Sequence, residues 1–326
     1  MNLAKLSALS LVVALAACGG GGGSSTAPTS DNGGGTPGGS GGTTAEPNAV
    51  TSVPALVYSQ AIYTDAFSRL NEVRAAAGIG LVAQHAYVDA AAQAHSDYLA
   101  VNDLTGHYET RTKTGWTGDT PADRIQAAGY GANSPWEAIA YANTTGADFV
   151  DMLVAAPYHR AGMLAYKAVH AGIGYAKYAT LSGYNLNIDI TSNATNFQGA
   201  SNTPAAIWPA NGATGILTRM TPESPNPVPE NNGSPAGYPV SVRVHEDKTL
   251  TVDSFTVTTA DGTPVSVKVL SYATDQNLIS LGFKFFAAAV PTAPLAAGTT
   301  YRASFAGKID GTAYSKSWSF TTKGAL

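Results

Sequence analysis

Two histidines, His107 and His159, lie in segments whose neighbours predict loops or turns. His107 stands in the run TGHYE, and His159 stands in PYHR, two residues after Pro157. Binding and catalytic groups are concentrated on loops that a rigid scaffold holds in place. An imidazole can bind a metal or transfer a proton near neutral pH. These two side chains are therefore the first candidates for a functional site.

Two carboxylates could join these histidines. Glu109 follows His107 by two residues, so both side chains would point to the same side of an extended chain. Glu137 stands alone in the run SPWEAIA, where an unpaired buried charge would be costly. Two interpretations of Glu137 stay open: it contributes to a site, or it only ties down a loop.

A pair of imidazoles with one or two carboxylates suits two kinds of chemistry. It can hold a divalent metal such as zinc, which takes His and carboxylate ligands at about 2.0–2.2 Å. It can equally perform acid–base catalysis, to which a positioned histidine contributes about 10²–10⁴-fold. A serine hydrolase is disfavoured, because no Gly-x-Ser-x-Gly motif lies in the domain that carries these residues.

Helices are predicted to position these side chains. Over residues 60–78 the apolar residues fall at 4-4-3-4 spacing and make one stripe. Three further helices are predicted over 86–102, 120–129 and 146–157, the last ended by its proline. His95 shares the apolar face of the second helix and is expected to be packed and hydrogen bonded. Strand-like runs at 171–179 and 183–190 complete an α+β or α/β sandwich.

The last part of the chain, 238–326, alternates apolar and polar residues at period two. Asp261-Gly262 and Asp310-Gly311 separate strand pairs and predict hairpin turns. About seven short strands are typical of an immunoglobulin-like (Ig-like) β-sandwich. The segment 199–237 is rich in Pro, Asn and Gly and is predicted to be a linker with an ordered entry into this sandwich.

The first 18 residues have the features of a secretory signal peptide. Lys5 precedes an apolar run over 6–15 that is too short to span a bilayer. The run ends in LAAC, which resembles the lipobox of bacterial lipoproteins and implies that Cys18, the sole cysteine, carries the lipid. The alternative is an ordinary signal peptide in which Cys18 is incidental. Residues 19–55 are mostly Gly, Ser, Thr and Pro at their start and predict a flexible tether.

Several blocks of the first domain resemble, in order and spacing, the bacterial branch of the CAP superfamily. This superfamily contains the cysteine-rich secretory, antigen 5 and pathogenesis-related proteins, whose domain is also called SCP-like. The resemblance implies a three-layer α-β-α sandwich over 56–198, so the chain is predicted to be α+β with the Ig-like sandwich as its second domain. The blocks span about 60–190 and read RLNEVRAAAGIGLV, DAAAQAHSDYLA, GHYE, TPADRIQAAGY, WEAIA, VDMLVAAPYHRAGML and HAGIGYA.

In that family, two histidines and two acidic residues line a central cleft. The motifs place His107, Glu137 and His159 at three of these four positions. The second acidic position reads Ala156, and Glu109 is the candidate that could replace it. The resemblance thus implies a cleft lined by His107, Glu109, Glu137 and His159, with the two histidines as candidate zinc ligands.

Three classes of function remain open: a binding module for a lipid or another small molecule, a metal-dependent or His/Glu hydrolase, and an adhesion or scaffold protein. The missing acidic position favours a non-catalytic ligand-binding or interaction protein, with the hydrolase as the alternative. The lipid anchor implies attachment to the outer membrane, on its periplasmic or surface face. Nucleic acid is not an expected partner, because the net charge is -4 and only 12% of residues are charged.

Overall fold

The computed structural model describes residues 51–193 and 203–325, without the side chains of 132–134 and 193. The predicted signal peptide, Cys18 and nearly all of the tether lie outside the described residues. Among the helices of the described part, none combines the length and the apolar character needed to cross a membrane.

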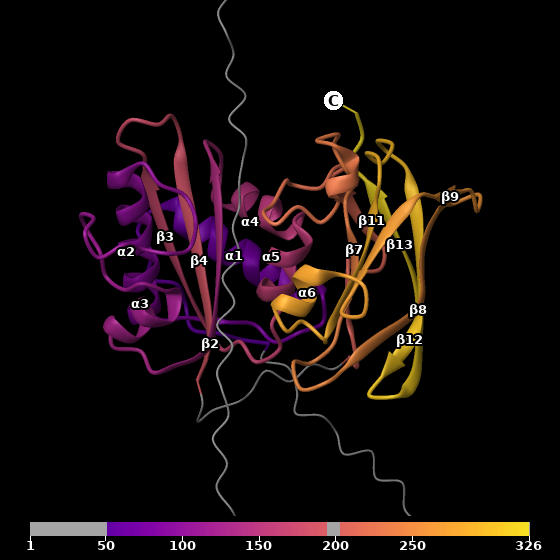
Figure 1. Ribbon diagram of the computed structural model, residues 1–326, viewed down its shortest axis with the longest axis horizontal. Helices are drawn as coiled ribbons and strands as arrows, with labels where there is room; N and C mark the ends of the chain where they lie inside the picture. The colour runs from indigo at the N-terminus through magenta and orange to yellow at the C-terminus, as the bar shows by residue number, and fades with distance from the viewer. Residues whose placement is uncertain (1–50, 194–202, 326) are drawn as a thin grey trace, which may run out of the picture.

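The first unit is a three-layer α-β-α sandwich, as the sequence predicted (Figure 1). Its sheet has the strand order β1-β3-β4-β2, in which only the β1–β3 pair is parallel. The strands are β1 (Ala83–Gln84), β2 (Ala132–Ala142), β3 (His170–Lys177) and β4 (Tyr184–Asn193). One face carries α2 (Ala86–Asn102) and α3 (Pro121–Ala127), and the other carries α1 (Ala61–Ala76), α4 (Gly146–Val154) and α5 (Pro157–Met163).

Two glycines of β3 let α2 lie unusually close to the sheet. A Cβ atom on Gly172 would lie 2.3 Å from the backbone of α2, and one on Gly174 would lie 2.1 Å from the carbonyl oxygen of Ala92. Any side chain at these positions would therefore push the helix away. The close approach brings His95 of α2 against the polar face of the sheet, where it is fully buried.

The second unit is a sandwich of two sheets, and its all-β character confirms the predicted fold class. The sheet orders are β10-β11-β7-β5 and β6-β13-β12-β8-β9. Neighbouring strands are antiparallel except β13 and β6. The strands are β5 (Ala206–Trp208), β6 (Ala213–Ile216), β7 (Val240–Arg243), β8 (Leu250–Thr259), β9 (Pro264–Val265), β10 (Val267–Ser271), β11 (Phe286–Pro291), β12 (Thr300–Ile309) and β13 (Thr312–Thr322), with the 3-10 helix η1 (Pro229–Asn231) and α6 (Gln276–Ser280) between them.

The two Asp-Gly pairs lie at hairpin turns, as predicted. Asp310 and Gly311 form the two-residue connection of β12 and β13 and have φ values of 48° and 82°, which suits the primed turns of tight hairpins. By contrast, part of the segment expected to be a linker enters the sandwich. β5 pairs with β7 and β6 pairs with β13. Strands of three and four residues are too short to give a period-two signal.

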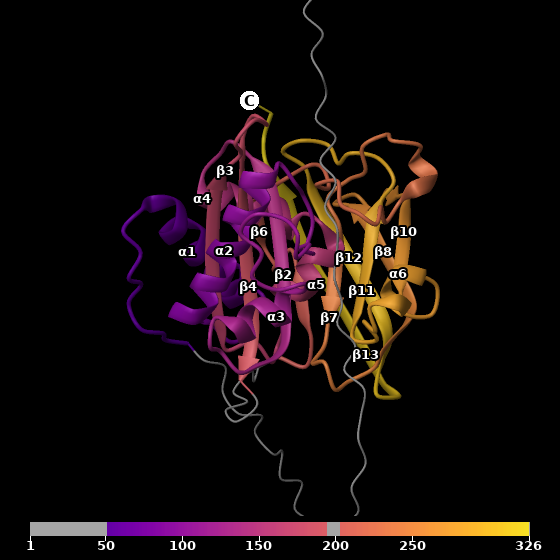
Figure 2. The same ribbon diagram turned by 60° about the vertical axis from the view of Figure 1, so that its left-hand side comes forward.

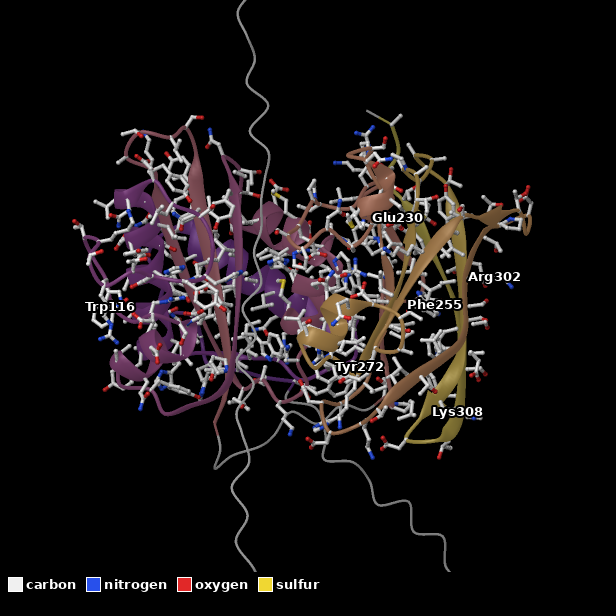
Figure 3. The ribbon with its side chains drawn as sticks, in the orientation of Figure 1. Trp116, Glu230, Phe255, Tyr272, Arg302 and Lys308 are labelled. Atoms are coloured by element: carbon white, nitrogen blue, oxygen red, sulfur yellow. The ribbon has the colours of Figure 1, made fainter. Side chains whose placement is uncertain are left out.

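The first sheet of the second unit packs toward the helical layer of α1, α4 and α5, so the two units share one apolar core (Figures 1 and 2). Every residue of α5 is buried. The other sheet faces solvent: Arg302 and Lys308 point outward from β12, while Phe255 points into the sandwich (Figure 3). The sequence suggested that Pro157 ends the preceding helix, and this is wrong. Helix α4 already ends at Val154, and Pro157 is the first residue of α5.

Candidate functional site

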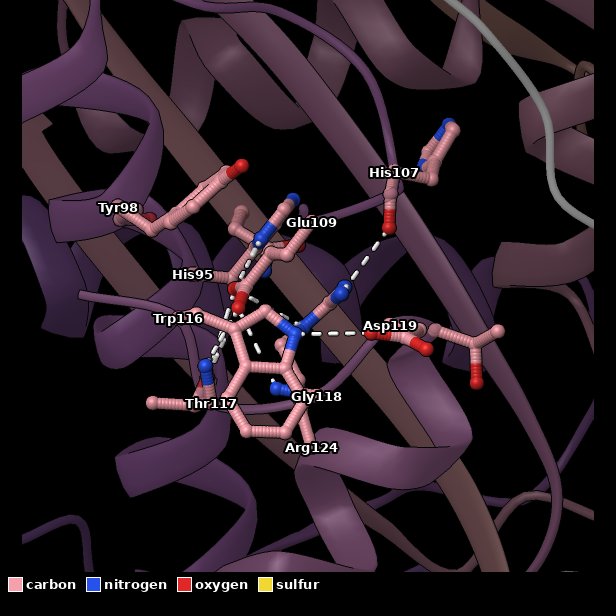
Figure 4. A network of polar contacts seen from close by, with 12 residues as sticks. His95, Tyr98, His107, Glu109, Trp116, Thr117, Gly118, Asp119 and Arg124 are labelled. Atoms are coloured by element: carbon pink, nitrogen blue, oxygen red, sulfur yellow. Dashed lines mark hydrogen bonds and ion pairs between the residues drawn. The ribbon is translucent and has the colours of Figure 1, made fainter. Parts of the chain in front are cut away.

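His107 lies in the loop between α2 and α3, and its imidazole is 1% exposed. Its Nδ1 donates a hydrogen bond of 2.7 Å to Oε1 of Glu137 on β2. The loop backbone is held in place because Arg124 of α3 donates to the carbonyl oxygen of His107 at 3.0 Å (Figure 4). Burial lowers the pKa of His107, against the opposing effect of Glu137, so the ring favours its neutral form. Its Nε2 is then an acceptor, and it has no partner.

Glu137, which the resemblance placed in the cleft, is hydrogen bonded through both of its oxygens. Oε2 accepts from Arg124 at 2.5 Å and from the side-chain amide of Asn187 at 3.1 Å. Burial alone would raise the pKa of Glu137, but the charge of Arg124 and the contacts with His95 and His107 bring it well below its usual range. Glu137 is therefore a carboxylate that fixes the orientation and the tautomer of His107.

His159 lies in α5, not in a loop as its sequence neighbours suggested. Its Nδ1 lies 2.7 Å from Oε2 of Glu223, a residue of the second unit between β6 and β7. The same carboxylate accepts from the backbone N–H groups of Tyr158 at 3.1 Å and His159 at 3.3 Å. Ala156, the N-cap residue of α5, offers no side-chain acceptor, so Glu223 caps this helix from a distant part of the chain.

Glu223 is the carboxylate that the sequence analysis missed. It lies 64 positions after His159, in the run TPESPNP, and no spacing rule links the two residues. The only available signal was that Glu223 is one of two acidic residues, with Glu230, in the proline-rich segment 199–237. In the structure it is 5% exposed and takes the role for which the sequence offered Glu109.

Glu109 does not contact His159, and this corrects the sequence expectation. Its Oε1 lies 2.9 Å from Nδ1 of His95, and its Oε2 accepts from the backbone N–H groups of Thr117 and Gly118 at 2.6 and 3.3 Å (Figure 4). The expectation assumed extended chain from His107 to Glu109, but this loop is irregular, so period two does not apply.

His95 is packed and hydrogen bonded, as its position on an apolar helix face predicted. Nδ1 faces Glu109, and Nε2 lies 3.0 Å from the carbonyl oxygen of Gly106. Because both ring nitrogens face oxygen acceptors, His95 satisfies both only as a cation. Arg124 and His95 then balance the charges of Glu109 and Glu137 in this buried cluster.

A row of polar side chains on β4 borders this cluster. Asn185, Asn187 and Asp189 are all fully buried and alternate with apolar residues that face the other side of the sheet. Asp189 pairs across the strands with Glu137, and neither of its oxygens has a hydrogen-bond donor. Burial, followed by the charge of Glu137, raises the pKa of Asp189 well above its usual range. Asp189 is therefore held as a neutral acid, which keeps the cluster balanced.

The two histidine–carboxylate pairs meet at a nearly closed centre. The rings of His107 and His159 are 6.4 Å apart between centroids and inclined by 29°, and both Nε2 atoms are buried without a partner. The adjoining cavity, which His159, Glu137 and Trp136 line with their neighbours, has a volume of about 10 Å³. That volume is about the least that accommodates one water molecule.

The arrangement fits only part of a metal site. A metal-bound histidine usually donates its other ring N–H to a carboxylate, and both His107 and His159 have such a partner. A catalytic zinc takes three protein ligands, however, and His107 and His159 supply only two Nε2 atoms. Within 51–193 and 203–325, no three His, Cys, Asp or Glu side chains are placed to hold a metal ion. The donor set does not fit the predicted zinc.

Comparison with known proteins supports the resemblance of the first unit. The family described as "CAP: Cysteine-rich secretory protein family" matches residues 67–188, from α1 to β4. The chain is also similar to a solved extracellular protein containing an SCP domain from Bacillus anthracis str. Ames, at 21% identity and a TM-score of 0.34. That similarity covers 40% of each chain, so the match spans less than half of the solved protein. No curated protein matches the chain.

We expect the substitution Glu223→Ala to destabilise the protein by about 1–3 kcal/mol, because it leaves the His159 ring and the first N–H groups of α5 without their acceptor. Urea unfolding would measure this loss. Glu230→Ala is the matched control: Glu230 belongs to the same segment, but its partner Lys268, at 3.0 Å, is a surface contact (Figure 3). Equal effects of the two substitutions would contradict the role of Glu223.

We expect Asp189→Asn to be more stable than the wild type at pH 7. The folded wild type keeps a proton on Asp189 that the unfolded chain releases above the usual pKa of Asp, so its stability falls as pH rises through that range. At pH 7 the free energy of unfolding of the variant should exceed that of the wild type by more than the roughly 0.5 kcal/mol of an ordinary surface substitution. This difference should shrink as the pH falls toward 4. Asp253→Asn, on the exposed face of β8, is the control. A difference in stability between Asp189→Asn and the wild type that does not change with pH would contradict the neutral state of Asp189.

Proposed function

We propose that this chain is an exported lipoprotein of the cell envelope whose two-unit body is a non-catalytic binding or interaction protein. One observation carries the second part of this proposal. His107 and His159 are 1% and 2% exposed beneath the second unit, and the cavity that His159 lines has a volume of about 10 Å³. Acid–base catalysis requires a substrate within hydrogen-bond reach of the ring nitrogen, and the cavity that the described residues leave beside His159 is too small for one.

The second unit is what closes the centre. Glu223 holds His159, the hydroxyl of Tyr158 donates to Asp275 at 3.0 Å, and Trp136 packs edge-on against Phe283 with centroids 4.8 Å apart. These contacts join both units around α5. Binding of a lipid in the predicted cleft would require them to separate, so we place the interactions of this protein outside the His/Glu centre.

The hydrolase remains the alternative because of one feature, the two imidazoles with carboxylate partners and unpartnered Nε2 atoms. That pattern suits a general base. It becomes productive only if the second unit moves away, which makes accessibility of the centre the property that separates the two functions.

We expect diethyl pyrocarbonate to leave His107 and His159 unmodified in the native protein, because neither Nε2 reaches solvent. His85 and His170 are half-buried and serve as internal controls that should react. Peptide mass spectrometry after short exposure would locate the modified rings. All four should react once the protein is unfolded.

Modification of His107 or His159 at the rate of His85 would show that the centre opens in solution. The non-catalytic proposal would then give way to the hydrolase. Substrate screens against His107→Ala and His159→Ala variants would be the next step in that case.

The lipoprotein part of the proposal is supported by the N-terminal sequence alone. The sole cysteine stands where the lipobox requires it, and a glycine-rich tether follows. A tether of this composition separates an anchor from a folded body without fixing their geometry. We place the anchor in the outer membrane, with the body on its periplasmic or surface face.

We expect the full chain to sediment with membranes and Cys18→Ser to be released, because stable anchoring depends on the buried acyl chains at about 0.8 kcal/mol per methylene. Mass spectrometry of the N-terminal peptide should show the acyl groups on Cys18. Ser24→Ala, in the same glycine-rich segment, is the control and should sediment like the wild type. An unmodified Cys18 would leave only an ordinary signal peptide.

A further inference from the structure

A second and larger cavity lies at the boundary of the two units, outside the His/Glu centre. Its volume is about 160 Å³. Strand β4 contributes Ile190 and Thr191, and β2 contributes Trp136. The turn after α5 contributes Ala168, and the second unit contributes Phe285. Since both units supply walls, the cavity exists only in the joined structure.

The apolar part of the wall is rigid. Phe285 stacks on Phe283 at 5.3 Å between ring centroids. The guanidinium of Arg243 lies 4.4 Å from the centroid of the Phe285 ring. Trp136 packs edge-on against Phe283 and against Gly162 of α5, where a Cβ would come within 3.2 Å of the indole. These rings are fixed by their neighbours, so they do not collapse into the space.

The empty space is a consequence of two small side chains. Ala165 and Ala168 line the cavity with single methyl groups and are themselves buried, at 2% and 4% exposure. A leucine at either position would occupy much of the volume. An apolar cavity of about 150 Å³ is large enough to bind benzene, so this one accommodates a single six-membered ring.

The charges in the wall are already neutralised. Lys167 contacts Asp247 at 2.5 Å, and Oε1 of Glu246 accepts from Arg243 at 2.5 Å. A charged ligand would lose its hydration without gaining a counter-ion, which is costly. The wall therefore favours a neutral ligand.

One polar group of the wall needs a donor. Oε2 of Glu246 is buried and has no hydrogen-bond partner, and a buried unpartnered acceptor costs about 1–3 kcal/mol. The hydroxyl of Thr191 donates to the carbonyl oxygen of Ser192 at 3.2 Å and keeps its acceptor capacity. A hydroxyl on the ligand could donate a hydrogen bond to Oε2 of Glu246 or to the hydroxyl oxygen of Thr191.

We propose that this cavity, called here the interdomain cavity, is a binding site for a neutral single-ring molecule that bears a hydroxyl, of the phenol class. The site goes beyond the proposed function, because it does not use His107 or His159. It adjoins their centre, however: Trp136 and Ile190 line both the interdomain cavity and the small cavity beside His159.

The test uses the full chain and phenol as the probe. Calorimetric titration would measure binding, with toluene, benzoate and benzylamine as comparison ligands. We expect phenol to bind at least about tenfold more tightly than benzoate or benzylamine, because only the charged ligands lose hydration without a counter-ion. Toluene should be weaker than phenol, since it offers no donor to Glu246.

Ala168→Leu fills the cavity and should weaken phenol binding at least about tenfold. Ala313→Leu, the same substitution at an exposed position of β13, should bind like the wild type. Circular dichroism would establish that each variant is folded, and Ala165→Leu replaces Ala168→Leu if the latter is not. A crystal grown with phenol should show the ring between Trp136 and Phe285.

Absence of phenol binding at millimolar concentration, or ordered water alone in the cavity of that crystal, would overturn the proposal. Unchanged binding in the filled variant would place the phenol elsewhere and overturn it as well. Equal binding of phenol and toluene would refute the role of the hydroxyl. None of these results bears on the closure of the His/Glu centre, which the histidine modification tests separately.

Discussion

Helix α5 is buried along its whole length between the sheet of the first unit and the second unit. A buried helix must find partners for its free N–H groups and for each polar side chain it carries. Its own sequence supplies none at the N-terminus. Glu223 accepts hydrogen bonds from the N–H groups and contacts the His159 ring. Arg160 donates to the carbonyl oxygen of Pro239 at 2.7 Å and to the hydroxyl of Ser241 at 3.1 Å. The joining of the units follows from this constraint, because neither unit alone could satisfy the helix.

The two halves of the His/Glu centre consequently have different origins. The His107–Glu137 pair is built wholly within the first unit, on a cluster in which two cations balance two carboxylates and Asp189 stays neutral. The close approach of α2 over the glycines of β3 seals that cluster from water and so sets its protonation. The His159–Glu223 pair instead depends on the second unit. Separation of the two units would free the His159 imidazole from Glu223 and leave the His107 imidazole bound to Glu137.

The sequence predicted most of the architecture, because the fold depends on long periodic segments. The apolar stripe over 60–78 and the apolar–polar alternation after Tyr238 each extend over many residues, so a single exception does not hide the pattern. α5 was missed because its seven residues, which begin with Pro157, are too few to carry a periodic signal. The short strands of residues 206–216 were missed for the same reason, and a proline-rich composition suggested a linker instead.

The site was predictable only where local motifs carried it. His107, Glu137 and His159 were found from their own segments, and the structure brings all three to one centre. Glu223 was not, because a contact across 64 residues is decided by the packing of two units. Glu109 was assigned from an assumed extended backbone that the loop does not have. The run NLNID shows its alternation in the sequence, but only the structure reveals that its polar side is buried as fully as its apolar side.

The distribution of small and large side chains explains why the cleft closes in one place and stays open in another. Beside His159, Gly162 lets the indole of Trp136 lie directly against α5, so the ring fills the space that a ligand would need. Just beyond Trp136, the alanines after α5 face fixed aromatic rings and leave about 160 Å³ empty. A protein that used the histidines for catalysis would need the opposite arrangement, with the space next to the imidazoles. The packing therefore directs ligand binding away from the histidines and toward the boundary between the units.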